Sequence, residues 1–150
     1  DCDEQPIYLD SKFGPFCIVT AGLIENQKEL KEYLFKNGMS FSEVSENEVN
    51  VTELIAKIIS MGDSIEEGIE KMFGMIEGSC SLLILHKDGI YAARDRLGYT
   101  PLTIGKGKDF WAVTFETNAF PNLQCEITKP LMPGEIVLIN EMLNYIKIIK

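Results

Sequence analysis

The sequence predicts an α+β domain in which antiparallel strands lie on both sides of a block of helices. Short apolar or alternating segments near the two ends of the chain are typical of strands. Between them, residues 26–76 repeat apolar side chains at helical spacing. Lys87-Asp88-Gly89 has the composition of a hairpin turn, which favours antiparallel pairing. Because strands and helices are segregated rather than alternating, the class is α+β.

Two strands are predicted before the helices. Residues 6–9 alternate weakly and precede a turn-forming cluster at residues 11–15. Residues 16–20 form a continuous apolar run, which predicts a strand buried on both faces. This strand is expected to end at Gly22, before a loop and a helix.

Three helices follow. The first is predicted to begin after Asn26 and to stop at Asn37-Gly38. The second carries an apolar stripe at positions i, i+3, i+4 and i+7 and stops at residues 61–62. The third begins near Ser64, where Ser64 and Glu67 fit a capping box, and its methionines are expected to fill the core.

The rest of the chain is predicted to be strands joined by turns. Two turns are expected at residues 87–89 and 105–108, and one helical turn at 117–120. Several strands lack clean alternation, so we expect a sheet covered on both faces by helices or by a second sheet. The strands are predicted at residues 79–86, 90–93, 102–104, 110–114, 134–139 and 145–149.

Composition limits the classes of partner. The hydrophobic fraction of 45% and the charged fraction of 25% are those of a globular protein, and residues 1–150 contain no repeat or linker, so one domain is expected. A net charge of −9 disfavours nucleic acid and anionic membranes as partners and indicates an acidic solvated surface. No apolar run approaches the roughly 18 residues of a membrane helix, and the acidic start is not a signal peptide, so a cytoplasmic location is expected.

The four cysteines, Cys2, Cys17, Cys80 and Cys125, are not in CxxC spacing. The last three lie in apolar runs and are therefore expected to be small buried residues in a reducing compartment. This pattern predicts neither a metal site nor a disulfide framework, and no cofactor is indicated.

Few single residues suggest chemistry by themselves. His86 ends an apolar strand and is interpreted as a hydrogen-bonded structural histidine. Arg94 and Asp95 follow a buried strand, where charges must be paired, so a structural ion-pair corner is expected. Gly22 has two interpretations: a glycine that permits a turn, or a backbone N–H able to bind an oxyanion.

An ordered series of motifs resembles the class II glutamine amidotransferases, and among them the N-terminal domain of amidophosphoribosyltransferases. The resemblance covers nearly the whole chain, and its ending Pro133-Gly134-Glu135-Ile136-Val137 favours the phosphoribosyl branch over the asparagine synthetases. The other segments that carry it are Gln5-Pro6, Phe13-Gly14-Pro15-Phe16, Ser45-Glu46-Asn47-Glu48-Val49, Arg94-Asp95-Arg96-Leu97-Gly98-Tyr99-Thr100-Pro101-Leu102 and Phe115-Glu116-Thr117-Asn118-Ala119.

The resemblance implies an N-terminal nucleophile hydrolase fold, a four-layer αββα sandwich. It also implies that an N-terminal cysteine, activated by its own amine, attacks the glutamine side-chain amide. The ammonia would pass to a second domain that binds phosphoribosyl pyrophosphate. An asparagine and the glycine N–H after it would form the oxyanion hole, and an arginine and an aspartate would hold glutamine.

Several of these features are altered in this chain. The chain is expected to begin after the family's cysteine segment, so the fold would lack its N-terminal strands. The family's His-Asn-Gly corresponds to Thr20-Ala21-Gly22: Gly22 keeps its backbone donor, whereas Ala21 offers no amide. Loss of one such donor typically costs about 10²- to 10³-fold in rate. The family's Ser-Asp corresponds to Ser45-Glu46, which keeps the α-amine-binding carboxylate but moves it by one methylene.

Whether the chain is an enzyme is left open by these residues. Cys2 is disfavoured as nucleophile because the adjacent Asp3 and Glu4 would raise its pKa, and this segment is not a glycine-rich buried strand. One hypothesis is an amidophosphoribosyltransferase-like domain whose nucleophile lies elsewhere. The alternatives are a pseudo-amidotransferase that binds glutamine or a protein, and an unrelated interaction module. Ala21 favours degeneration of the site, and open apolar edges predict self-association or a partner chain.

Overall fold

The computed structural model describes residues 4–42, 44–45, 48–140 and 145–148. Four helices and eleven strands lie in this part of the chain. In chain order they are β1 (Ile7–Ser11), β2 (Gly14–Ile24), α1 (Gln27–Lys36), β3 (Val44–Ser45), β4 (Glu48–Val49), α2 (Val51–Ser60), α3 (Ile65–Met75), β5 (Gly78–His86), β6 (Gly89–Ala93), β7 (Thr103–Lys106), β8 (Trp111–Thr114), α4 (Ala119–Leu123), β9 (Glu126–Pro130), β10 (Ile136–Asn140) and β11 (Tyr145–Ile148).

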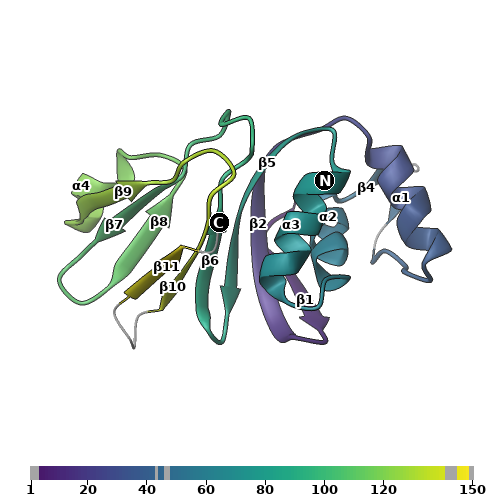
Figure 1. Ribbon diagram of the computed structural model, residues 1–150, viewed down its shortest axis with the longest axis horizontal. Coiled ribbons are helices and arrows are strands. Elements are labelled where there is room, and N and C mark those ends of the chain that lie inside the picture. Colours follow the sequence, from purple (N-terminus) through teal and green to yellow (C-terminus); the bar gives the residue numbers. More distant parts are fainter. Residues whose placement is uncertain (1–3, 43, 46–47, 141–144, 149–150) are drawn as a thin grey trace.

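Two antiparallel sheets form the centre of the molecule. The larger sheet has six strands in the order β1-β2-β5-β6-β10-β11, and the smaller has three in the order β8-β7-β9. The helices α1, α2 and α3 lie on one side of the larger sheet, and the smaller sheet and α4 lie on its other side (Figure 1). A separate hairpin of β3 and β4 leads into α2.

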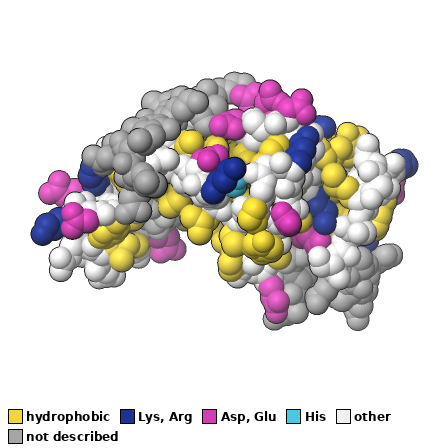
Figure 2. Space-filling view, turned by 90° about the horizontal axis from the view of Figure 1, so that it is seen from below, with side chains coloured by type: hydrophobic (Ala, Val, Ile, Leu, Met, Phe, Trp, Pro, Cys, Tyr) yellow, Lys and Arg dark blue, Asp and Glu magenta, His cyan; other side chains and the backbone are white. Residues whose placement is uncertain are grey.

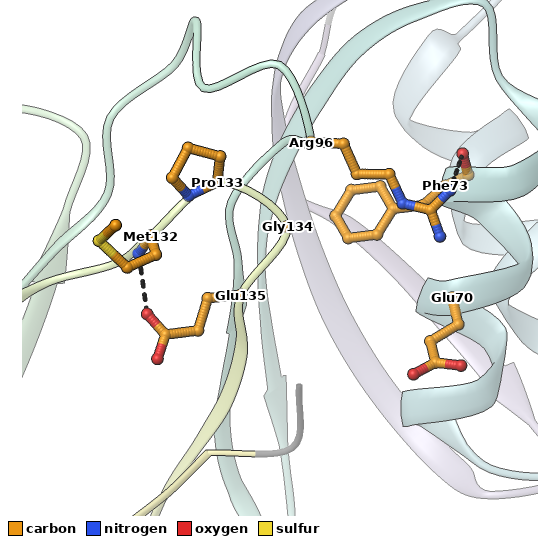
Figure 3. A pocket seen from close by; sticks show the side chains of 7 residues that line it. All are labelled: Glu70, Phe73, Arg96, Met132, Pro133, Gly134 and Glu135. Atoms are coloured by element: carbon orange, nitrogen blue, oxygen red, sulfur yellow. Dashed lines mark hydrogen bonds between the residues drawn. The ribbon is translucent and has the colours of Figure 1, made fainter.

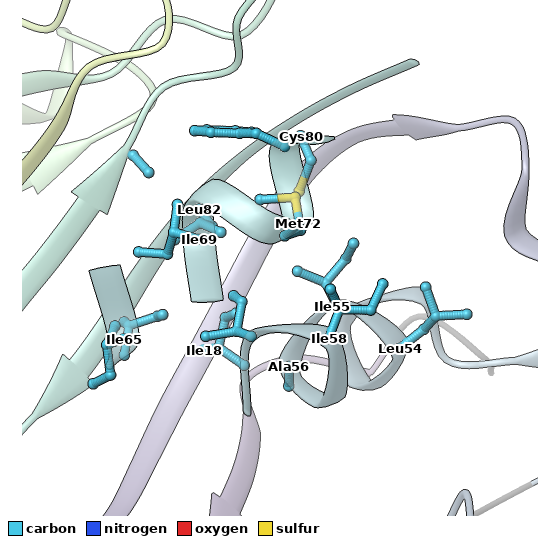
Figure 4. Packing of buried hydrophobic residues seen from close by; sticks show 14 of the residues in the cluster. Ile18, Leu54, Ile55, Ala56, Ile58, Ile65, Ile69, Met72, Cys80 and Leu82 are labelled. Carbon is cyan, nitrogen blue, oxygen red and sulfur yellow. The ribbon is translucent and has the colours of Figure 1, made fainter. Parts of the chain in front are cut away.

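The main core lies between the larger sheet and helices α2 and α3 (Figure 4). The apolar stripe of α2 faces Ile18 of β2 and Leu82 of β5, which have no exposed surface. Each such buried aliphatic side chain contributes roughly 1.5–3 kcal/mol relative to an exposed one. The two helices approach closely because Gly68 of α3 lies against α2, where an added Cβ would be 2.1 Å from the carbonyl oxygen of Ile59.

The second core lies between the two sheets. Ile104 of β7 faces the larger sheet and is fully buried, whereas the next residue, Gly105, faces Phe120 of α4. The layers therefore run helix, sheet, sheet, helix, so the αββα architecture is confirmed. The buried members of this core are Ala92, Leu102, Ile104, Leu131, Val137 and Ile139.

The predicted helices are confirmed to within a few residues. Asn26, Asn50 and Ser64 occupy the N-cap positions, although the Asn26 side chain makes no cap hydrogen bond and instead bonds Met75 and Glu77. Ser64 Oγ accepts a hydrogen bond from Glu67 N–H at 3.2 Å. The Glu67 carboxylate accepts a hydrogen bond from the N–H of Asp63. In a capping box it would accept from the N–H of the N-cap residue, Ser64.

Some strand predictions were wrong in detail. β2 continues past Gly22 to Ile24 and buries only one face in its apolar run, because the second sheet does not extend over it. The strands β3, β4 and β9 were not predicted. β9 is largely exposed and ends in proline, so it lacks the apolar signal of a buried strand.

The cysteine prediction holds only for Cys80, which is buried, whereas Cys17 and Cys125 are half-buried. Cys17 lies on the side of β2 that the second sheet leaves uncovered. The described helices include none with the length and apolar character that crossing a membrane requires.

Candidate functional site

The motif Thr20-Ala21-Gly22 lies at one end of the larger sheet. Antiparallel pairing brings the end of β2, the beginning of β5, the end of β6 and the beginning of β10 together there. Gly22 is opposite Cys80, and Ala93 is opposite both Leu82 and Ile136. Residues that are distant in sequence therefore meet at the edge where the predicted oxyanion site lies.

Gly22 is required by the approach of two strands. Its φ is +153°, and an added Cβ would lie 2.1 Å from the carbonyl oxygen of Ser79 on β5. Because it lies inside β2, it is not the turn glycine of the simpler interpretation. It is also exposed, so its backbone is accessible from solvent. Its role as an oxyanion donor stays a prediction.

Ala21 is the cross-strand neighbour of Ser81, and its side chain lies on the face of the sheet opposite the helices. The preceding Thr20 is held by side chains on the other face. Its N–H donates to Gln5 Oε1 at 2.8 Å, and its hydroxyl is 2.7 Å from that of Thr52 on α2. The backbone at Ala21 is thus fixed, but its methyl group supplies no hydrogen bond.

Glu46, the predicted α-amine ligand, lies outside the described residues, as does Cys2. The helix that follows Glu46 is well anchored. Asn50 caps α2 by accepting from Glu53 N–H at 3.1 Å, and its amide donates to the carbonyl of Glu4 at 2.9 Å. A buried carboxylate that the sequence reasoning missed, Glu53, accepts from Ser42 and pairs with Lys57 at 3.3 Å.

The Arg94-Asp95 corner is organised by hydrogen bonds. The buried Asp95 carboxylate accepts from Ser81 Oγ at 3.2 Å and from the N–H groups of Tyr99 and Thr100 at 3.1 and 2.9 Å. Arg94 donates to the carbonyls of Leu131 and Gly98. The expected ion-pair corner was therefore wrong in its chemistry: within the described part of the chain, neither charge forms a salt bridge. Its structural role is supported, because these bonds shape the loop beside Ala21.

A hollow of about 360 Å³ lies at the same end of the sheet, between α3 and the segment before β10 (Figure 3). Its lining does not include Ala21 or Gly22. Arg96 lies over the ring of Phe73 at 5.4 Å and donates to the Phe73 carbonyl, while Glu135 accepts from Met132 N–H and pairs with Lys129. Because these charges already have protein partners, we assign no ligand to this hollow.

Two chemically reactive residue types near the sheet are structural. Burial, and secondarily the charge of Asp95, raises the pKa of Cys80 to about 12, so its thiol stays protonated and is a poor nucleophile. His86 Nε2 lies 3.1 Å from the carbonyl oxygen of Phe13, and its Nδ1 lies 3.2 Å from Asp88. This confirms the interpretation of His86 as a hydrogen-bonded structural residue. Across residues 4–140, where described, no three or more His, Cys, Asp or Glu side chains gather as a metal site would need.

Comparison with known proteins places this geometry in a family. A family model described as a glutamine amidotransferase domain matches residues 1–122. The amidophosphoribosyltransferase of Methanocaldococcus jannaschii is 32% identical over 137 residues, which cover 91% of this chain and 29% of that protein. The amidophosphoribosyltransferase of Archaeoglobus fulgidus is 28% identical over 149 residues, covering 99% of this chain and 32% of that protein.

A solved structure shows the same arrangement. The glutamine phosphoribosylpyrophosphate amidotransferase of B. subtilis, complexed with ADP and GMP, superposes with a TM-score of 0.83 at 27% identity. The match covers 97% of this chain and 31% of that one. This chain spans about three-tenths of the length of the relatives that it matches. It belongs to the glutamine amidotransferase domain family.

Proposed function

We propose that this chain is the glutamine-binding domain of an amidophosphoribosyltransferase-like protein, with weak or absent glutaminase activity of its own. In this proposal residues 1–150 are a partial glutamine amidotransferase domain, and the ammonia it would help release goes to phosphoribosyl pyrophosphate in purine biosynthesis. The similarity to amidophosphoribosyltransferases over 91–99% of the chain supports this assignment.

The observation that carries the proposal is that the Ala21-Gly22 pair keeps the backbone donor of the oxyanion site but lacks the side-chain donor. Gly22 offers an exposed backbone at the rigid end of β2, suited to receive a developing oxyanion without reorganisation. Ala21 removes the side-chain donor that the family places beside it. Glutamine binding is therefore expected to survive better than stabilisation of the tetrahedral intermediate, since only the latter requires both donors.

The nucleophile in this proposal lies outside the described residues. Of the cysteines within them, Cys80 is held protonated, and Cys17 and Cys125 lie inside or beside strands rather than at a chain terminus. An N-terminal cysteine on a longer form of the protein would supply both thiolate and base. Glu46 is the proposed ligand of the glutamine α-amine.

A second candidate is a pseudo-amidotransferase that senses glutamine or binds a protein. Ala21 favours this second candidate. A nucleophile encoded elsewhere would not explain why an alanine stands at the position of the oxyanion asparagine. The glutamine-sensing form of this candidate shares glutamine binding with the first candidate and differs from it in hydrolysis.

The test compares two forms of the protein. Calorimetry of the chain with glutamine and glutamate should show binding; its absence would reject the first candidate and the glutamine-sensing form of the second, and would leave a protein-interaction role. In a longer gene product that begins with cysteine, Ala21→Asn should raise glutaminase activity by about 10²- to 10³-fold. Ala112→Asn on β8 is the matched control and should change nothing. A longer gene product with no terminal cysteine that still binds glutamine would leave the pseudo-amidotransferase as the function.

A further inference from the structure

The ladder between β1 and β2 stops before it reaches the Thr20-Ala21-Gly22 motif. Ile7, the first residue of β1, is opposite Ile18, and the same register would place Gln5 opposite Thr20. Pro6 lies between these two positions and has no backbone N–H to donate. Because β5 pairs with the other side of β2, the backbone groups of Thr20 that point towards β1 need a different partner.

The side chain of Gln5 is that partner. Its Oε1 accepts a hydrogen bond from the Thr20 N–H at 2.8 Å, and its Nε2 donates to the Thr20 carbonyl at 3.2 Å. An amide side chain carries a donor and an acceptor in one plane, as a peptide group does. The Gln5 amide thus takes the place of a strand backbone at the residue directly before Ala21.

The beginning of α2 holds both members of this contact. Asn50, the N-cap of α2, donates from its Nδ2 to the carbonyl of Glu4 at 2.9 Å, which fixes the backbone next to Gln5. The Thr20 hydroxyl lies 2.7 Å from the hydroxyl of Thr52, which is 2% exposed. The Gln5 amide is therefore placed against β2 by contacts with the helix.

The contact also sets the direction of the Gly22 N–H. In an antiparallel sheet, the backbone groups of alternate residues point to the same side of a strand. The Thr20 N–H points to Gln5 and away from β5, so the N–H of Gly22, two residues later, is directed to that side as well. A rotation of the Thr20 backbone would turn the donor that is predicted to bind the oxyanion.

We propose that Gln5 is a positioning residue for the oxyanion site, whose side-chain amide holds the Thr20 backbone so that the Gly22 N–H faces the side-chain carbonyl of bound glutamine. This inference rests on the proposed function, because it takes Gly22 as a donor to glutamine. It gives both residues of the Gln5-Pro6 motif a role: Pro6 ends the β1 ladder, and Gln5 continues it with a side chain. Since Ala21 has no side-chain donor, the direction of the Gly22 N–H matters more.

Two variants of Gln5 test its two bonds. Gln5→Met keeps the length of the side chain and removes both bonds, whereas Gln5→Glu keeps the acceptor for the Thr20 N–H. Asn140→Leu is the matched control, because Asn140 Nδ2 donates to the carbonyl of Asp88 at 2.8 Å in another exposed bond from a side chain to the backbone. This control lies at the other end of the sheet, which Figure 2 shows with the single histidine of the chain in cyan among charged side chains.

The first measurement is amide hydrogen exchange by NMR without glutamine. In Gln5→Met the Thr20 N–H should exchange about fivefold faster, as expected for the loss of one exposed hydrogen bond, while Ile84 in the middle of β5 keeps its rate. Gln5→Glu and Asn140→Leu should leave the Thr20 rate close to that of the parent chain. An unchanged Thr20 rate in Gln5→Met would overturn the proposal, and so would an equal rise at Ile84, which would mark a general loss of stability.

The second measurement is a glutamine titration of the same proteins, followed at the Gly22 amide by NMR and by calorimetry. Glutamine should shift the Gly22 resonance of the parent chain. Gln5→Met should weaken glutamine binding by about fivefold and reduce that shift at saturation, Gln5→Glu should recover part of both, and Asn140→Leu should match the parent.

The titration separates two kinds of failure. Equal affinity and an equal Gly22 shift in the parent and in Gln5→Met would overturn this proposal and leave the proposed function in place. Absence of glutamine binding by the parent chain would reject glutamine binding as its function, and this inference together with it.

Discussion

The two faces of the six-stranded sheet differ in burial although both are apolar in sequence. On the helix side, Ile18, Leu82 and Ile84 have no exposed surface. On the other side, Leu85 of the same strand is 61% exposed, and only the β6 and β10 part of that face is covered by the second sheet. A leucine in a strand thus indicates that its face can be buried, while the extent of the next layer decides whether it is.

This comparison can be tested with leucines on one strand. Leu82→Ala should lower the free energy of unfolding by about 2–5 kcal/mol, because it removes buried methyl groups and leaves a cavity against α2 and α3. Urea unfolding monitored by circular dichroism measures the change. A loss below about 1 kcal/mol would show that the helix side is less tightly packed than its burial indicates.

The next largest effect concerns the loop after β6, which contains Asp95 and lies beside Ala21 on the side of the sheet away from the helices. Asp95→Ala should cost about 3 kcal/mol, because the hydroxyl of Ser81 and two backbone N–H groups lose their buried acceptor. Asp109→Ala, at an exposed position, is the control and should stay within about 0.5 kcal/mol of the parent. Faster hydrogen exchange at Tyr99 and Thr100 should accompany the loss, and unchanged exchange would argue against the assigned role.

A smaller effect should appear on the helix side when the pH is raised from 9 to 10. The pKa of Cys80 is raised from 9.0 to about 12, so the folded state keeps a proton that the unfolded state releases. Stability is therefore complete below pH 9 and is lost as the pH rises towards 12, by at most about 1.4 kcal/mol per pH unit. Cys80→Ala should remove this share of the pH dependence, whereas Leu82→Ala should retain it. Parallel curves for the parent and Cys80→Ala would contradict the shift.

The smallest effect is expected on the face of β5 that points away from α2 and α3, where Leu85 lies. Leu85→Ala should change the free energy of unfolding by less than about 0.5 kcal/mol, since its side chain is mostly in solvent. Urea titration beside Leu82→Ala gives the contrast directly. A cost similar to that of Leu82→Ala would mean that this face is covered.

The candidate site was located from sequence only in part. The motif Thr20-Ala21-Gly22 identified the strand end, and its missing amide is visible in the sequence as Ala21. The sequence did not show that Gly22 lies inside β2 or that the backbone of Ser79 requires a glycine there, because that contact depends on the β2–β5 register. Asp95 was singled out as a charge needing a partner, but the partner proved to be Ser81 and two amides rather than Arg94.

The sequence by itself determined the three helices, the N-cap positions of the first and third, and the strand-helix-strand order, because these depend on local periodicity and on side chains within a few residues. It also determined the family, through motifs kept in order along the chain. Only the tertiary structure decided which apolar strand positions are buried, why β9 forms, and that an uncovered face borders Ala21. These features depend on which strands lie side by side and how far the second sheet reaches, and such non-local contacts leave no periodic signal in the chain.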